Sequence, residues 1–190
     1  MEIGSFCGLS TNMITYAKEK LGKKNKLITC DKWKFEGSNS VMLGDSTFVT
    51  HAEYKDFVKK SYMRNISMFS RFDYPYTLEM LSDEFFHAWS NEINCVDVLD
   101  RPIKLGGPIS FCYIDGNHTY EQAKQDFINC DTYLEKDGFI LFDDSADGSG
   151  WEVCKVIEEV IALERYAVIQ NNPNYLFKKI MHDSLYSNDD

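Results

Sequence analysis

Acidic side chains follow two apolar stretches of the chain, and this pattern indicates an enzyme that acts on small molecules. Asp115 ends the stretch 109–115, and Asp143 and Asp144 end the stretch 139–144. Both stretches have the continuous apolar character of strands in a parallel sheet. The carboxyl ends of such strands lie at the edge where open α/β folds bind their ligands. We therefore expect these carboxylates to lie in a ligand site.

Two further acidic residues lie near the start of the chain, one of them in a glycine-containing turn. The segment Glu2-Ile-Gly4-Ser5-Phe-Cys-Gly8 has the pattern of a strand-to-helix turn in which glycines let the backbone approach a ligand. Glu2 can accept hydrogen bonds from a cationic ligand. Asp31 ends the next expected strand, at about the ~20-residue separation from which an acid reaches the ribose hydroxyls of a nucleoside. The alternative is a tight turn beside a surface aspartate.

Composition limits the classes of protein and of partner. The chain has 190 residues, is 44% hydrophobic and carries a net charge of -10, from 30 acidic and 20 basic residues. This length predicts one globular domain, 1–190. The acidic balance argues against nucleic acid and anionic membranes as partners. The six cysteines show no paired spacing, and without an apolar span or export signal we expect free thiols and a cytoplasmic protein.

Hydrophobic periodicity predicts a βαβ series that ends in a hairpin. Leu9, Met13 and Tyr16 are expected to form the buried face of the first helix, and Thr119 and Gln122 a capping box for a helix that ends at Asp137. The fold class is therefore α/β, with a Rossmann-like, doubly wound, mostly parallel sheet and a terminal antiparallel hairpin. The expected helices are 9–21, 119–137 and 151–163, and the expected strands beyond those at 109–115 and 139–144 are 27–30, 166–170 and 175–178.

The segment 33–107 is rich in aromatic residues and has a weaker pattern. It predicts helices around 54–62 and from Ser82, and a strand over 66–69. Core packing accounts for most of its aromatics, and the others could line a substrate pocket or a homodimer contact. We interpret 33–107 as the variable substrate or oligomer region, and 184–190 as a frayed tail.

These features together resemble the class I S-adenosylmethionine-dependent methyltransferases. Their first motif resembles Glu2-Ile-Gly-Ser-Phe-Cys-Gly8, their ribose-binding acid resembles Asp31, and their late hairpin resembles 166–178. The segments Ile114-Asp-Gly-Asn-His-Thr-Tyr-Glu121 and Leu141-Phe-Asp-Asp144 are similar to those of small-molecule O-methyltransferases related to the catechol and macrolide-sugar enzymes.

The resemblance implies S-adenosylmethionine as the methyl donor and a divalent cation, with Mg²⁺ expected. The donor would be bound by residues of the first turn and by two aspartates, and the cation by three carboxylates. Because adjacent strands lie ~4.8 Å apart, side chains at their ends can share one hard cation. Successive strand residues point to opposite faces, so Asp143 and Asp144 can bind together only where the strand has already turned. The implied donor residues are Glu2, Gly4, Ser5, Gly8, Asp31 and Asp115, and the implied metal ligands are Asp115, Asp143 and Asp144.

His118 follows Asp115 in the same loop, and its ordinary pKa suits a base for a substrate hydroxyl. The activated hydroxyl would attack the methyl carbon of the sulfonium donor in line, with His118 and Asp115 as the catalytic residues. Related loops often carry aspartate where this chain has Asn117, so the base could lie at 117, at 118, or be replaced by the metal.

Three other interpretations remain open from the sequence. A NAD-dependent dehydrogenase would use the pair Tyr120 and Lys124, although Ser10 stands where its third turn glycine belongs. An iron-dependent hydroxylase could share the fold, and a cofactor-binding protein without transferase activity could share both fold and site. Only Met1 and Glu2 precede Ile3, so we also expect an apolar extension ahead of Met1 to stabilise the first strand.

Overall fold

The computed structural model describes residues 1–34 and 42–181, so the expected tail at 184–190 lies outside the described residues. The chain divides into two compact units. The N-terminal unit comprises residues 2–105, and the C-terminal unit comprises Met1 together with the chain from Gly106 onward. No helix in the described ranges is long and apolar enough to cross a membrane. The organisation as one domain stays a prediction.

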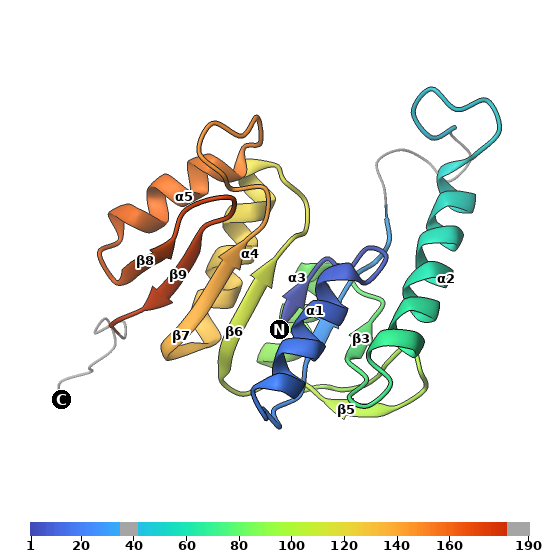
Figure 1. The fold of residues 1–190 in the computed structure, drawn as a ribbon, viewed down its shortest axis with the longest axis horizontal. Coiled ribbons are helices and arrows are strands. Elements are labelled where there is room, and N and C mark those ends of the chain that lie inside the picture. Colours follow the sequence, from blue (N-terminus) through green and yellow to red (C-terminus); the bar gives the residue numbers. More distant parts are fainter. Residues whose placement is uncertain (35–41, 182–190) are drawn as a thin grey trace. The chain divides into compact units, whose positions relative to one another are not determined.

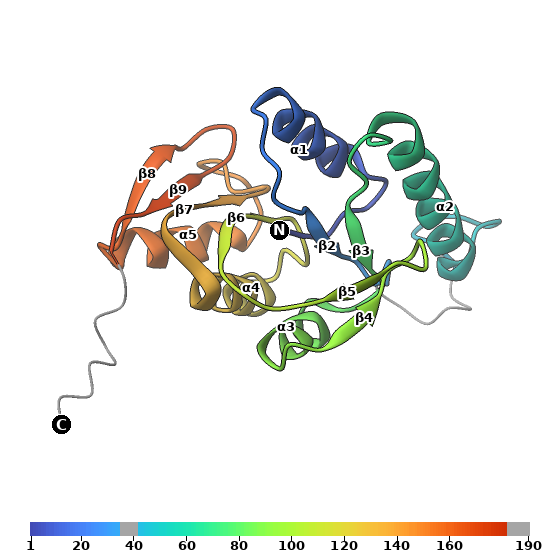
Figure 2. The same cartoon turned by 90° about the horizontal axis from the view of Figure 1, so that it is seen from below.

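The N-terminal unit contains three parallel strands in the order β3-β2-β1. Ile3 lies opposite Cys30, which in turn lies opposite Leu78. Helices α1 and α2 lie side by side on one face of these strands, and α3 with the antiparallel pair β4-β5 lies on the other (Figure 2). Its elements are β1 (Glu2–Ile3), α1 (Leu9–Lys20), β2 (Ile28–Cys30), α2 (His51–Phe69), β3 (Tyr76–Leu78), α3 (Ser82–Ser90), β4 (Asn94–Val96) and β5 (Pro102–Lys104).

The first helix exists as predicted, but its predicted buried face is wrong. Leu9, Met13 and Tyr16 are 76%, 63% and 60% exposed, whereas Thr11 and Thr15 are buried. Thr11 donates to the carboxylate of Glu2, and the Thr15 hydroxyl lies 2.5 Å from that of Ser70. Because these hydroxyls find hydrogen-bond partners in the interior, the polar side of α1 can pack inward.

Helix α2 is longer than predicted, and the strand expected over 66–69 is wrong because these residues form its last turn. The helix begins with a complete capping box between Thr50 and Glu53, which satisfies two backbone donors at its start. Its buried side chains recur at every fourth position and therefore form one continuous apolar stripe. One core cluster of this unit, which includes three residues of this stripe, consists of Trp33, Val58, Tyr62 and Ile66.

The C-terminal unit contains four strands in the order β6-β7-β9-β8 (Figure 1). Strands β6 and β7 are parallel, and β9 pairs antiparallel with both β7 and β8. This arrangement confirms the predicted α/β class with its terminal hairpin. Helices α4 and α5 lie side by side (Figure 1). The elements are β6 (Ile109–Ile114), α4 (Tyr120–Tyr133), β7 (Leu134–Phe142), α5 (Val153–Ala162), β8 (Tyr166–Gln170) and β9 (Leu176–Lys179).

Both ends of α4 differ from the prediction. Thr119 is the N-cap, but its side chain makes no capping hydrogen bond; instead Glu152 accepts from the backbone N–H of Tyr120 at 3.1 Å. The helix ends at Tyr133 rather than at Asp137, which lies inside β7. The ammonium of Lys179 explains the earlier end, because it donates to two carbonyl oxygens there, those of residues 131 and 134.

A buried group of charged side chains joins α4 to the hairpin. The carboxylate of Asp131 accepts a hydrogen bond from Arg165, another at 2.5 Å from the hydroxyl of Tyr166, and pairs with Lys179 at 2.9 Å. The side chains of Asp131 and Lys179 are 8% and 4% exposed. Burial, together with Asp131, raises the pKa of Tyr166. The group is a structural tie, because its charges are paired with one another.

Candidate functional site

The residues that the sequence singles out form two groups, one in each unit. The first group surrounds the turn between β1 and α1, and the second lies at the carboxyl ends of β6 and β7.

The turn between β1 and α1 has a backbone that requires glycine. Gly4 and Gly8 have φ angles of 78° and 87°, in the left-handed region that other residues rarely adopt. A side chain at Gly8 would also lie 3.0 Å from the ring of Tyr62. The N–H of Gly8 donates to the carbonyl of Ser5 at 2.7 Å, which closes the turn. The predicted turn is therefore present at the predicted residues.

Asp31 holds this turn through its carboxylate. Its Oδ2 accepts hydrogen bonds from the backbone N–H groups of Ser5 at 2.9 Å and Phe6 at 2.8 Å, and its Oδ1 accepts from that of Trp33 at 2.6 Å. Burial raises the pKa of Asp31, and these hydrogen bonds oppose the rise. A carboxylate offers about four acceptor positions, so three are used and about one remains for a ligand hydroxyl.

Two further side chains hold the turn, and the sequence analysis did not identify them as site residues. The indole N–H of Trp33 donates to the carbonyl of Phe6 at 2.9 Å, and the amide of Asn65 donates to that of Cys7 at 2.8 Å. Asn65 lies on α2, 58 residues from its partner. No local motif marks such a contact, because it depends on how α2 packs against the turn.

Glu2 is completely buried beside the turn. Its Oε2 accepts a hydrogen bond from Thr11 at 2.6 Å. Its Oε1 is buried without a hydrogen-bond partner among the described residues, as are the hydroxyls of Ser5 and Thr29. Burial raises the pKa of Glu2 to about 7, although the hydrogen bond from Thr11 favours its ionised form. A buried acceptor without a partner is costly, so the position fits a ligand that brings a cationic donor.

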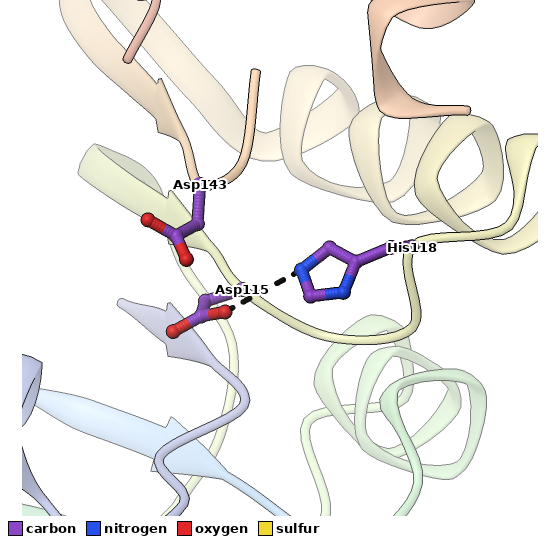
Figure 3. A group of neighbouring side chains, drawn as sticks. All are labelled: Asp115, His118 and Asp143. Carbon is purple, nitrogen blue, oxygen red and sulfur yellow. Dashed lines mark ion pairs between the residues drawn. The ribbon is translucent and has the colours of Figure 1, made fainter. Parts of the chain in front are cut away.

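The second group brings together Asp115, His118 and Asp143 (Figure 3). Asp115 follows β6, Asp143 follows β7, and His118 lies in the loop that leads to α4. One potential ligand atom from each residue lies within 4.8 Å of the others. The N–H of Asp143 donates to the carbonyl of Ile114 at 2.9 Å, so the ladder between the two strands fixes the separation of the carboxylates. Two oxygens and one nitrogen are a donor set that fits a divalent cation.

Asp144 lies beside this group rather than within it. Strand β7 ends at Phe142, and Asp144 has a φ of 51°, so the chain has turned as simultaneous binding of both aspartates requires. Its carboxylate lies 3.7 Å from Nε2 of His118, and that of Asp115 lies 3.6 Å from the same nitrogen. Both separations exceed hydrogen-bond length. His118 thus stands where the prediction had a third carboxylate, and ligation by Asp144 stays a prediction.

The surroundings of Asp115 and His118 raise the pKa of both side chains. Burial, followed by the charge of Asp143, raises the pKa of Asp115 to about 6, while His118 opposes the rise. The pKa of His118 is raised by Asp115 first and by the other two aspartates, against the effect of burial. Asp143 accepts a hydrogen bond at 2.8 Å from the amide of Asn174. The group is therefore a concentration of negative charge that a cation would stabilise.

Three residues near this group, Asn117, Tyr120 and Lys124, have local structural contacts. The side-chain oxygen of Asn117 accepts from the N–H of Thr119 at 2.9 Å, which forms a turn within the loop. Lys124 donates to the hydroxyl of Tyr120 at 2.7 Å, and both side chains interact with Glu159. The tyrosine and lysine pair of the dehydrogenase interpretation, on α4, is thus bound to the carboxylate of Glu159 on α5.

Comparisons with known proteins identify a family from the sequence and a fold from the structure. The family model described as "Methyltransferase domain" matches residues 1–145. No curated protein sequence matches the chain. Among solved structures, the O-methyltransferase NovP aligns with a TM-score of 0.60 at 10% identity, covering 95% of this chain and 72% of its own. The TDP-rhamnose 3'-O-methyltransferase CalS11 of calicheamicin biosynthesis aligns with a TM-score of 0.56 at 14% identity, covering 94% of this chain and 70% of its own. An O-methyltransferase from Bacillus cereus in complex with SAH aligns with a TM-score of 0.57 at 16% identity, covering 95% of this chain and 72% of its own.

The family match covers both groups of candidate residues, from the first turn to the aspartates after β7. The structural neighbours share the fold over nearly the whole chain. The predicted resemblance and the Rossmann-like fold class are thereby confirmed. The chain belongs to the methyltransferase-domain family and is an S-adenosylmethionine-dependent methyltransferase.

Proposed function

We propose that the protein transfers a methyl group from S-adenosylmethionine to a hydroxyl of a small molecule, with the help of a divalent cation. The observation that supports this acceptor chemistry is that Asp115 and Asp143, at the ends of adjacent parallel strands, lie close to His118 in the loop after β6. Oxygen and nitrogen ligands with a base close by suit the activation of a hydroxyl. NovP, CalS11 and the Bacillus cereus protein are all named as O-methyltransferases, which points in the same direction.

The donor is assigned to residues of the first turn, to Asp31 and to Asp115. The left-handed glycines let the backbone approach the donor closely, and Asp31 retains acceptor capacity for a ribose hydroxyl. Glu2 supplies a buried, unpartnered oxygen that suits a cationic part of the donor. The proposed donor residues are Glu2, Gly4, Ser5, Gly8, Asp31 and Asp115.

The cation is assigned to Asp115, Asp143 and Asp144, with His118 as either a ligand or the base. When bound, the cation lowers the pKa of a coordinated hydroxyl. The acceptor hydroxyl gives its proton to His118, and its oxygen forms a bond to the methyl carbon as the bond between that carbon and sulfur breaks. The products are a methyl ether, the neutral thioether of the donor and a proton held on the imidazole. His118 must be neutral to accept that proton.

Calorimetric titration with S-adenosylmethionine, in Mg²⁺ and again in chelator, tests the donor and the cation separately, with NADH as the comparison ligand. We expect saturable binding of S-adenosylmethionine in both buffers, no binding of NADH, and methyl transfer to hydroxylated acceptors in Mg²⁺ alone. Equal transfer rates in chelator would exclude the cation from the mechanism and leave the donor assignment intact.

One observation favours a second candidate. The cluster of the three ligand atoms includes a histidine nitrogen, and imidazole suits iron better than magnesium. An iron-dependent hydroxylase would consume oxygen when loaded with Fe²⁺ and supplied with a substrate and a two-electron reductant, and it would transfer no methyl group in Mg²⁺. Measuring oxygen uptake beside methyl transfer on the same preparations separates the two candidates.

A further inference from the structure

One aromatic side chain beside the Asp115 and His118 loop has no part in the proposed chemistry. Of the chain's three tryptophans, Trp33 and Trp89 are 1% and 5% exposed, whereas Trp151 is 52% exposed. The ring centroid of Trp151 lies 5.0 Å from that of His118, with 43° between the planes. Exposed indoles are uncommon, because tryptophan buries a large apolar surface when it packs. An indole exposed beside the candidate base is therefore placed to meet a ligand.

The backbone around Trp151 is held in place from several sides. Glu152, the next residue, accepts from the N–H of Tyr120 at 3.1 Å and pairs with Lys155 at 2.7 Å. This joins the start of α5 to the start of α4, just after the loop that carries His118. The neighbouring segment is also anchored, because Asp147 accepts from the hydroxyl of Tyr175 at 2.6 Å. These contacts hold the chain on both sides of the half-exposed indole that lies beside the imidazole.

The charges around Trp151 limit the kind of ligand it can receive. Asp115 and Asp144 both lie within 4 Å of His118, and Asp143 belongs to the same group. Three carboxylates repel an anionic ligand and attract the positively polarised hydrogens of a neutral one. The flat face of an indole makes a larger stacking contact with a ring than with an open-chain molecule.

We propose that Trp151 is the stacking surface of the acceptor subsite, and that it selects neutral acceptors whose hydroxyl is carried on a ring. The proposal rests on the proposed function, since it places the acceptor hydroxyl at the Asp115, His118 and Asp143 cluster. Catechol and methyl glucoside represent the two sources of such a ring, one aromatic and one a sugar. Glycerol carries the same vicinal hydroxyls without a ring.

Binding of the three probes, measured in Mg²⁺ with wild type, Trp151→Ala and Trp151→Phe, tests the proposal without turnover. We expect Trp151→Ala to weaken binding of at least one ring probe by about tenfold and to leave glycerol binding unchanged. Trp151→Phe keeps a ring face and should lose less than about threefold. Ile169→Ala is the matched control, because Ile169 on β8 is also 52% exposed.

Fluorescence provides the second arm. The emission that Trp151→Phe removes from the wild-type spectrum belongs to Trp151, and a stacked ring should change it. Equal weakening of glycerol and ring probes in Trp151→Ala would overturn the proposal, since it would mean that the indole acts only by positioning His118. Ring probes that leave the emission unchanged would also overturn it.

The methyl-transfer assay distinguishes failure of the stacking subsite from failure of the proposed transferase chemistry. The wild-type protein could transfer no methyl group to any hydroxyl and still lose its ring selectivity in Trp151→Ala. That result would support the stacking subsite and contradict the proposed transferase chemistry. Methyl transfer to hydroxyls with an acceptor KM that is unchanged in Trp151→Ala would support the transferase chemistry and contradict the stacking subsite.

Discussion

Glu2 should make the ligand-free protein less stable as the pH rises. Burial raises its pKa from 4.5 to about 7. Between these values the folded state keeps a proton that the unfolded chain has lost, so the free energy of unfolding falls as pH increases. A shift of this size corresponds to roughly 3 kcal/mol, fully lost above about pH 7. That is a large part of the ~5–15 kcal/mol that stabilises a typical domain.

Glu2→Gln removes the charge and keeps the shape. The amide oxygen can still accept from Thr11, and the amide nitrogen can donate towards Thr29, whose hydroxyl has no partner among the described residues. We therefore expect the variant to be about 2–3 kcal/mol more stable than wild type at pH 8, and about equal to it near pH 4.5. Denaturant unfolding at both pH values, without ligand, measures the difference.

Glu92→Gln is the matched control, because Glu92 is exposed and Lys104 lowers its pKa. The control should gain no stability at pH 8. A Glu2→Gln variant that is no more stable than wild type at pH 8 would refute the conclusion that the buried charge is a cost. Binding of S-adenosylmethionine should move in the opposite direction and weaken in Glu2→Gln, since the proposed donor meets the ionised carboxylate.

Three further predictions concern single contacts. Asp131→Asn leaves Lys179 buried without its charge partner and should cost about 3–5 kcal/mol in denaturant unfolding, while adding Lys179→Met should recover part of that loss. Gly8→Ala should lower the free energy of unfolding by about 1–3 kcal/mol and weaken donor binding in calorimetry. The control is Gly148→Ala, because Gly148 is also left-handed but has open space around it; this variant should cost about 1 kcal/mol or less and leave donor binding unchanged. Asp143→Asn should reduce Mn²⁺ affinity at least about tenfold in calorimetry, and an unchanged affinity would remove it from the ligand set.

The sequence predicts the alternation of strands and helices because each unit of that pattern is local. The strand at 166–170 is found at the predicted residues, and the acids after β6 and β7 lie at the strand ends as expected. Those features depend on runs of apolar side chains that stop at a polar residue, which any short window of sequence contains.

The errors arise where distant residues decide the outcome. The buried face of α1 carries Thr11 and Thr15 because their partners are Glu2 and Ser70, which hydropathy alone does not indicate. The end of α4 is set by Lys179, which lies more than 40 residues further along the chain. Local propensity favours a helix past Tyr133, and the tertiary contacts of a buried ammonium override it.

The two groups of site residues share one physical property. In the N-terminal unit, Glu2 presents a buried carboxylate oxygen without a partner, and in the C-terminal unit Asp115 has a pKa raised to about 6. Each arrangement costs stability in the ligand-free protein, because burial or like charge opposes ionisation. A cationic ligand beside each carboxylate would favour its ionised form and turn both costs into contributions to binding. The proposed donor is a sulfonium cation and the proposed second ligand is a divalent metal, so the same acidity that repels polyanions would favour both.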